Sequence, residues 1–333
     1  MDPPQVVERA HRDGGATLPA ARPAPLQWTR RPEIPLPNTL VHFAAQGPTS
    51  HAIWRRVDPR WFYLGCLLPD VPWILRRAVV GFALPVDTYD LRLYTMALAS
   101  LAGTLLLCAA LAVVTRAPRL VFGILGVNAL LHLLLDACEV KWGNGVHLLA
   151  PFSWKMTTFN IVDGASWPVL VLTLLGAVLV AWEIRRWHPP AIRLDLGARR
   201  LATAAALLAV YLVAPLPFLG AVQASDSYSV RTLREVDERP GRTVGLDRTT
   251  FVASPAGGFV EMWNGERVRV TGQLPDHDAR VSLHGTFLEP DLLRVDRLVV
   301  HEGSRDWPSY LALVLLALLW LRPWLPPRRA PTS

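Results

Sequence analysis

Cysteine is scarce in this chain of 333 residues, and its three cysteines, Cys66, Cys108 and Cys138, lie far apart. A disulfide framework or a thiolate metal site needs paired or closely spaced cysteines, so we expect neither. Lysine is also rare, because arginine carries almost all of the basic charge behind the net charge of +7. The arginines lie between apolar runs, which is typical of membrane topology and argues against nucleic-acid binding.

The first 37 residues are rich in Pro, Ala and Arg and show no apolar periodicity. Residues 1–37 are therefore predicted to be a disordered tail, without the continuous apolar core of a secretory signal. Elsewhere the chain is strongly apolar, with 51% hydrophobic residues and a mean hydropathy of +0.27. Such a composition predicts an α-helical polytopic protein of the cell membrane, in contact with the lipid bilayer.

Long apolar segments that are nearly free of charge are predicted to span the bilayer, which requires about 20 residues. The predicted spans are residues 93–115, 120–138, 167–183, 201–222 and 307–321, the last leading into a tail that ends at residue 333. Residues 223–306 are inserted before this last span.

The segment 38–78 contains two shorter apolar pieces, neither long enough to span a bilayer. Asn38 is a suitable N-cap for the first piece, which Gly47 and Pro48 are expected to interrupt. The second piece ends at Pro69-Asp70. Together they predict a re-entrant helical hairpin that brings His42 and Asp70 to the same side of the membrane.

The inserted segment 223–306 has a different pattern, with short runs of β-branched and apolar residues bounded by Gly, Pro, Asn and Asp. Several runs alternate with period two, and about five strands in roughly 65 residues predict a small antiparallel β-barrel of the OB type. No run of aromatic and basic residues indicates nucleic-acid binding. We expect this domain to be a scaffold or to contact a protein partner.

Polar residues recur on one face of the helix predicted at 120–138. Asn128, His132 and Asp136 are spaced four apart, which stacks them along one side of an α-helix otherwise rich in leucine. Ionisable side chains in such a segment are costly, so they should have a partner or a function. Asn128 is expected to orient His132 or Asp136 through a hydrogen bond.

Together with His42 and Asp70, His132 and Asp136 make a set of two imidazoles and two carboxylates. This set suits zinc or a similar divalent ion, with room for a water that the metal converts into a nucleophile. Taken singly, His42 also fits an interfacial or capping residue, and Asp70 a turn. His147, in the loop that follows, fits either an extra ligand or a surface residue.

Three segments, LVHFAAQG, GCLLPDVPWI and LLHLLLDACEVKWGNGVHLLAPFSW, resemble the bacterial and archaeal membrane-bound metal-dependent hydrolase-like proteins. More distantly they are similar to zinc-dependent phospholipase C. The resemblance covers about residues 38–160 and does not include the β domain. It implies metal-ligand or catalytic roles for His42, Asp70, His132 and Asp136.

The chain departs from this family at one motif. Many members carry HRGxTHS at the start of the first full span, where residues 91–97 here read LRLYTMA. Arg92 and Thr95 align with the motif, but both histidines are absent. Asp87 and Asp90, just upstream, are candidates to replace them.

The expected function is a divalent-metal-dependent hydrolase for a membrane-associated substrate such as a phosphoester lipid, with Asp70 or Asp136 as the base. The alternative is a non-catalytic membrane scaffold whose polar cluster is structural; a transporter is disfavoured because no internal repeat is present. The span order places the loop 139–166 and the β domain on one side. Five arginines within 185–200 favour a cytoplasmic location for that segment, with the site and the β domain outside.

Overall fold

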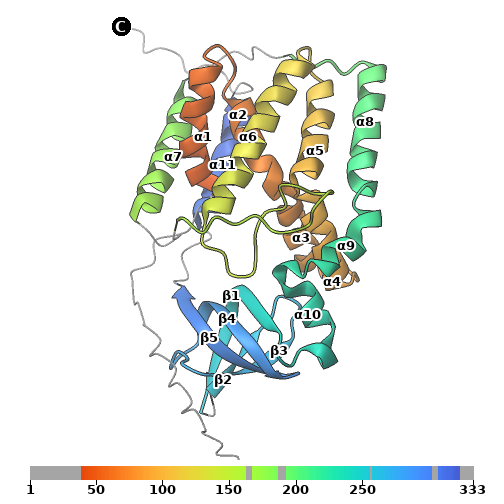
Figure 1. Ribbon diagram of the computed structural model, residues 1–333. Helices are drawn as coiled ribbons and strands as arrows, with labels where there is room; N and C mark the ends of the chain where they lie inside the picture. Colours follow the sequence, from red (N-terminus) through yellow and green to blue (C-terminus); the bar gives the residue numbers. More distant parts are fainter. Residues whose placement is uncertain (1–38, 163–166, 187–192, 256, 302–306, 323–333) are drawn as a thin grey trace, which may run out of the picture.

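The computed structural model describes residues 39–162, 167–186, 193–255, 257–301 and 307–322. The tail predicted for residues 1–37 and the cap predicted at Asn38 lie outside the described residues. A bundle of long helices stands at one end of the molecule and a small β-barrel at the other (Figure 1). The loop of residues 139–162 lies between them.

The helical bundle is built from apolar segments, as the composition predicts. Its helices are α1 (Thr39–Ile53), α2 (Arg60–Leu67), α3 (Val71–Gly81), α4 (Thr88–Leu98), α5 (Leu101–Val113), α6 (Pro118–Cys138), α7 (Trp167–Arg185), α8 (Ala198–Val213) and α11 (Trp307–Leu321). Helix α6 lies against α1, α2 and α5, so the helix that carries the predicted site is enclosed by the others.

Three helical segments are long and apolar enough to cross a membrane: Pro118–Cys138, Pro168–Arg185 and Ala198–Ala224. A fourth is reached if α4 and α5 count as one bent span. The fifth predicted span, residues 307–321, is helix α11, and its 15 residues are fewer than a bilayer-spanning helix needs. At 1.5 Å per residue it measures roughly 22 Å, which is shorter than a hydrocarbon core of about 30 Å.

The segment predicted as a hairpin forms α1 and α2, whose connection lies at the end of the bundle away from the barrel (Figure 1). The expected interruption at Gly47-Pro48 is wrong, because α1 continues through Pro48 to Ile53. The hydroxyl of Thr49 donates to Ala45 O at 2.7 Å and helps to satisfy this turn. After α2, the 3-10 helix η1 (Leu68–Asp70) leads directly into α3.

The predicted span 93–115 is broken. Helices α4 and α5 meet at 68°, because Ser100 ends one helix and caps the next by accepting a hydrogen bond from Gly103 N. The span predicted at 201–222 lies within Ala198–Ala224, which is long and apolar enough to cross a membrane. Within this segment α8 ends at Val213, and Pro215 and Pro217 precede the short helix α9 (Leu219–Ala224). Both breaks lie toward the barrel end of the bundle (Figure 1).

The β domain is a closed five-stranded barrel with strand order β1-β2-β3-β5-β4. Its strands are β1 (Thr243–Ser254), β2 (Gly257–Glu261), β3 (Arg267–Thr271), β4 (Ala279–Glu289) and β5 (Leu292–His301). Alternate residues point inward and form one apolar core. The barrel is not fully antiparallel, because closure pairs β3 with β5 in parallel.

Strands begin only at Thr243, later than the predicted domain boundary at 223. The preceding chain forms the short helices η3 (Ser227–Ser229), α10 (Val230–Arg234) and η4 (Val236–Glu238), with η2 (Leu216–Phe218) before α9. Backbone of the loop and of the barrel touch at Gly143 and Gly245, where a Cβ on Gly245 would lie 2.6 Å from Gly143 Cα. The loop and the barrel are therefore at the same end of the bundle, as the span order predicts.

Candidate metal centre

Two polar stripes face each other between α1 and α6. Each stripe has residues four apart, and the two run in opposite directions: His42, Gln46 and Ser50 on α1, and Asp136, His132 and Asn128 on α6. The Ser50 hydroxyl donates to Asn128 Oδ1 at 2.9 Å at one end. The histidines and Asp136 meet at the other end. A single i, i+4 pattern on each helix therefore builds the whole site.

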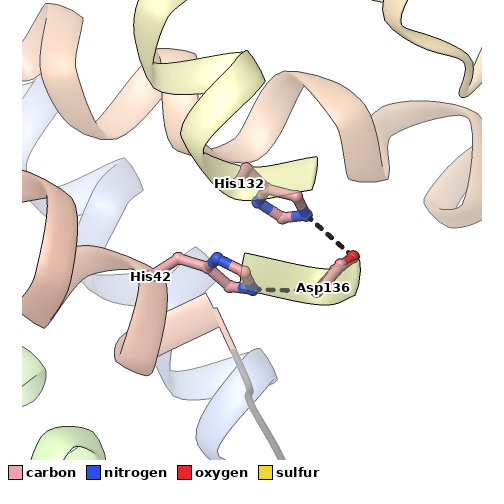
Figure 2. Close-up of side chains that lie close together, drawn as sticks. All are labelled: His42, His132 and Asp136. Atoms are coloured by element: carbon pink, nitrogen blue, oxygen red, sulfur yellow. Dashed lines mark ion pairs between the residues drawn. The ribbon is translucent and has the colours of Figure 1, made fainter. Parts of the chain in front are cut away.

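The two histidines and Asp136 form a compact group (Figure 2). The imidazole rings of His42 and His132 stack with centroids 3.9 Å apart and an interplanar angle of 11°. His42 Nε2 lies 3.3 Å from Asp136 Oδ1, and His132 Nε2 lies 3.4 Å from Asp136 Oδ2. Both histidines are almost fully buried, whereas the Asp136 side chain is 24% exposed.

Asp70 approaches the same group from η1. Its Oδ1 lies 3.6 Å from His132 Nε2, and its side chain is 34% exposed. The hairpin of α1 and α2 thus brings His42 and Asp70 to one end of the bundle, where both lie close to His132. All four residues singled out in the sequence are close to one another.

The donor set fits a divalent metal ion. One ligand atom each from His42, His132 and Asp136 lie within 4.8 Å of one another. The contacts of 3.3 and 3.4 Å go to different oxygens of Asp136, so both carboxylate oxygens lie beside an imidazole nitrogen. Imidazole nitrogen and carboxylate oxygen are ligands that such an ion accepts. The group could therefore hold one metal ion.

Gln46 fixes the orientation of this group. Its amide is satisfied when the nitrogen donates to Asn128 Oδ1 at 3.2 Å and Asn128 O at 2.8 Å, and the oxygen accepts from His132 N at 3.2 Å. The amide atom 3.4 Å from His42 Nδ1 is then the oxygen. It accepts the Nδ1 proton of His42 and leaves the Nε2 lone pair directed at Asp136, as metal ligation requires.

The direct role predicted for Asn128 is wrong. Its side chain accepts from Ser50 and donates to Ile124 O at 2.9 Å, and it makes no hydrogen bond to His132 or Asp136. It acts on the site only through Gln46. Gln46 was missed in the sequence, although its position four residues after His42 places it on the same face of α1.

A cavity of about 50 Å³ opens beside the cluster. Asp70, His132 and Asp136 line it, together with Lys141 and His147 from the loop. This volume holds a few water molecules. Water could therefore reach the carboxylates from the barrel end of the bundle.

Loop residues set the charge of this cavity. Burial alone would lower the pKa of the Lys141 ammonium, but the carboxylates of Glu139 and Asp136 outweigh it and raise this pKa above its ordinary value. Lys141 Nζ lies 2.7 Å from Glu139 Oε2. Burial also lowers the pKa of His147 to about 4, so its imidazole is neutral at neutral pH. His147 is buried and not a surface residue, yet it does not belong to the candidate metal group.

The proposed replacements for the missing histidines lie elsewhere. Asp90 pairs with Arg234 at 2.9 Å, and Asp87 caps α4 by accepting from Tyr89 N and Asp90 N. Neither carboxylate lines the cavity beside the cluster. Arg92 faces a second cavity, toward the barrel.

Tyr228 stands between the two cavities and lines both of them. Its backbone has φ = +58°, in the left-handed region that non-glycine residues rarely adopt. Its amide donates to Gly143 O at 2.9 Å, which ties it to the loop. Sequence reasoning missed Tyr228 because no pattern links residue 228 to the helices of the site.

Comparison of the chain with protein-family models, with curated proteins and with solved structures finds no match.

Proposed function

We propose that this chain is a multi-pass membrane protein that acts as a divalent-metal-dependent hydrolase on a membrane-associated substrate, such as a phosphoester lipid. The observation that carries the proposal is the buried pair of histidines facing Asp136 at one end of an apolar helix bundle. Burying such groups is costly without a function or a compensating ion. The resemblance of residues 38–160 to the membrane-bound metal-dependent hydrolase-like proteins also supports this proposal.

His42, His132 and Asp136 would hold the ion, with zinc as the candidate. A bound zinc ion supplies a hydroxide nucleophile near neutral pH. Asp70 is 3.6 Å from His132 Nε2 and partly open to the cavity, so it is placed to accept a proton from an attacking water. The Lys141 ammonium lines the same cavity, where it is paired with Glu139.

Metal analysis of the purified full-length protein tests this proposal. We expect near-stoichiometric metal in the wild type and a loss of at least about tenfold in affinity in His132→Ala and Asp136→Asn. Residues that share one ion are coupled, so the double variant should lose little more than either single variant. His51→Ala, an exposed position on the same helix as His42, is the matched control and should retain the metal.

The alternative is a non-catalytic scaffold in which the two polar stripes are a structural network. The hydrogen bonds from Ser50 to Asn128 and from Gln46 to Asn128 favour it, since such bonds hold helices together in membranes. A stable wild-type protein without metal, or fully additive losses in the double variant, would support the scaffold and contradict the shared site.

A further inference from the structure

The second cavity lies between the helix bundle and the barrel and has a volume of about 290 Å³. Arg92 of α4 lines it on the bundle side, and Trp263 lines it from the connection between β2 and β3. The Arg92 guanidinium lies 4.2 Å from the centroid of the Trp263 ring and 5.0 Å from that of Tyr228. The aromatic rings hold the guanidinium in place but accept few of its protons.

The buried side-chain polar atoms without partners at this cavity are donors, and the exposed carboxylate of Glu261 also lines it. Arg92 Nε, Arg92 Nη1 and Trp263 Nε1 are buried and have no hydrogen-bond partner among the described residues. Arg76 Nε is also buried without a partner, and its guanidinium lies 6.0 Å from the same indole ring, but Arg76 does not line this cavity. A buried donor without an acceptor costs about 1–3 kcal/mol, and more when it is charged. The three donors of the cavity wall call for a ligand rich in acceptors.

Charge leads to the same requirement. Neither Arg76 nor Arg92 forms an ion pair with any residue in the described part of the chain. The carboxylate of Asp247 in the cavity wall interacts electrostatically with Arg92, and it accepts hydrogen bonds from Asn144, Ser282 and Arg248. Two arginines on one tryptophan repel each other unless an anion lies between them.

We propose that this cavity binds a phosphate group, with the Arg92 guanidinium as its anchor, Trp263 Nε1 as a further donor and the positive charge of Arg76 close by. A guanidinium donates two parallel hydrogen bonds to phosphate oxygens, and the remaining oxygens accept from other directions. The donors come from α4 and the β2–β3 connection, so the ligand joins the bundle to the barrel. The site stands independently of a metal at His132.

Thermal unfolding of the full-length protein in an uncharged detergent tests the site. At constant ionic strength, inorganic phosphate or glycerol phosphate should raise the Tm of the wild type, whereas acetate should not. Transfer into bilayer discs that contain phosphatidic acid, compared with phosphatidylcholine alone, tests whether a lipid supplies the phosphate. A response to the soluble ions but not to the anionic lipid assigns a soluble ligand, and the reverse assigns a lipid headgroup.

Arg92→Met separates ligand binding from structural stacking. Methionine keeps an unbranched apolar side chain but removes the charge, so the phosphate response should weaken by about tenfold or more in apparent Kd. Without phosphate the variant should be as stable as the wild type, because an uncompensated buried charge has been removed. If Arg92→Met fails to fold, Arg76→Gln should weaken the response as well, with the exposed neighbour Arg77→Gln as the control.

The proposal would be overturned if the Tm of the wild type did not rise with inorganic phosphate, glycerol phosphate or phosphatidic acid. It would also be overturned if acetate raised the Tm equally. A full phosphate response in Arg92→Met or Arg76→Gln would likewise overturn it. A large loss of stability in Arg92→Met at every phosphate concentration would instead assign Arg92 to structural stacking.

Discussion

At the scale of single residues, the candidate metal centre depends on which nitrogen of each histidine is free. For His42 the answer comes from Gln46, whose amide oxygen accepts the Nδ1 proton and directs Nε2 at Asp136. His132 Nδ1 has no partner among the described residues, so its ring is held by stacking on His42 and by the contacts of Nε2. The orientation of His42 is thus the better defined of the two.

We expect Gln46→Leu to weaken metal binding by about 10–100-fold while all the proposed ligands remain, because the proton position of His42 is no longer fixed. The measurement is metal affinity of the purified protein by competition with a chelator. His51→Ala, an exposed position on the same helix, serves as the control. Equal metal affinity in Gln46→Leu and the wild type would contradict the role assigned to the amide.

The pKa of His147, lowered to about 4 by burial, makes a prediction for stability. The unfolded chain binds a proton at this histidine below about pH 6.5, whereas the folded protein binds it only below about pH 4. Stability is therefore lost as the pH falls from about 6.5 to 4, and about 2 kcal/mol should disappear between pH 7.5 and pH 5. Replacing His147 by Leu should remove this part of the pH dependence.

Thermal unfolding of the wild type and of His147→Leu at both pH values measures the effect. Other titrating groups contribute equally to the two proteins, so the difference in their pH dependence reports His147. If the stability of the wild type and of His147→Leu changed equally between the two pH values, the imidazole would not be buried in the neutral form.

At the scale of elements, local patterns predicted much of the fold. A small barrel of about five strands was expected within residues 223–306, and five strands are present in the described residues, because a period of two marks a sheet with one buried face. The parallel pairing of β3 with β5 was not predictable, since it follows from closure and not from any strand's own sequence. The break at Ser100 was missed because one serine in an apolar run is compatible with a continuous helix.

The residues of the candidate metal centre were also predictable from local sequence patterns. His42, Asp70, His132 and Asp136 stood out as polar residues at the ends of apolar segments, and the structure brings them together. Arg92 was considered only as a possible residue of the same site. Its actual surroundings come from residues more than 130 positions later, such as Tyr228 and Trp263, which no local pattern can indicate.

The contact between loop and barrel gives a prediction at this scale. A Cβ on Gly245 would lie within 2.6–2.8 Å of backbone atoms of Gly143 and Trp142, which cannot move aside as a side chain can. We expect Gly245→Ala to displace the loop and to destabilise the protein by about 1–3 kcal/mol. Gly220→Ala, whose new Cβ meets open space, is the control.

Limited proteolysis shows whether the loop has moved. Cleavage within residues 139–162 should become faster in Gly245→Ala than in the wild type or in Gly220→Ala. Unchanged proteolysis and stability would show that the barrel does not hold the loop over the candidate metal centre.

At the scale of the whole molecule, the two cavities share one feature: both lie where the bundle meets the barrel. The first is lined by the ends of α6 and η1 and by the loop, and the second by α4, the loop and the barrel. The ring of Trp142, in the loop, lies 5.0 Å from His284 of β4 and covers this junction. If the bundle spans a membrane, this junction is on one side of it.

That geometry predicts which positions are accessible together. Phe152 in the loop is 97% exposed, and the side chain of Asp276 in the barrel is 90% exposed. Arg119 is exposed at the start of α6, at the opposite end of the bundle. Single cysteines at positions 152 and 276 should therefore react alike with a membrane-impermeant maleimide in intact cells, and a cysteine at position 119 should react oppositely.

Cys138→Ser is a sufficient background for this experiment, because Cys66 and Cys108 are buried and free. The excess of arginine near residues 185–200 predicts that positions 152 and 276 react in intact cells and that position 119 reacts only after permeabilisation. The opposite result for all three positions would invert the orientation but keep the arrangement. Reaction at position 152 without reaction at 276, with both reactive after permeabilisation, would separate the loop from the barrel. It would also contradict the shared face on which both cavities depend.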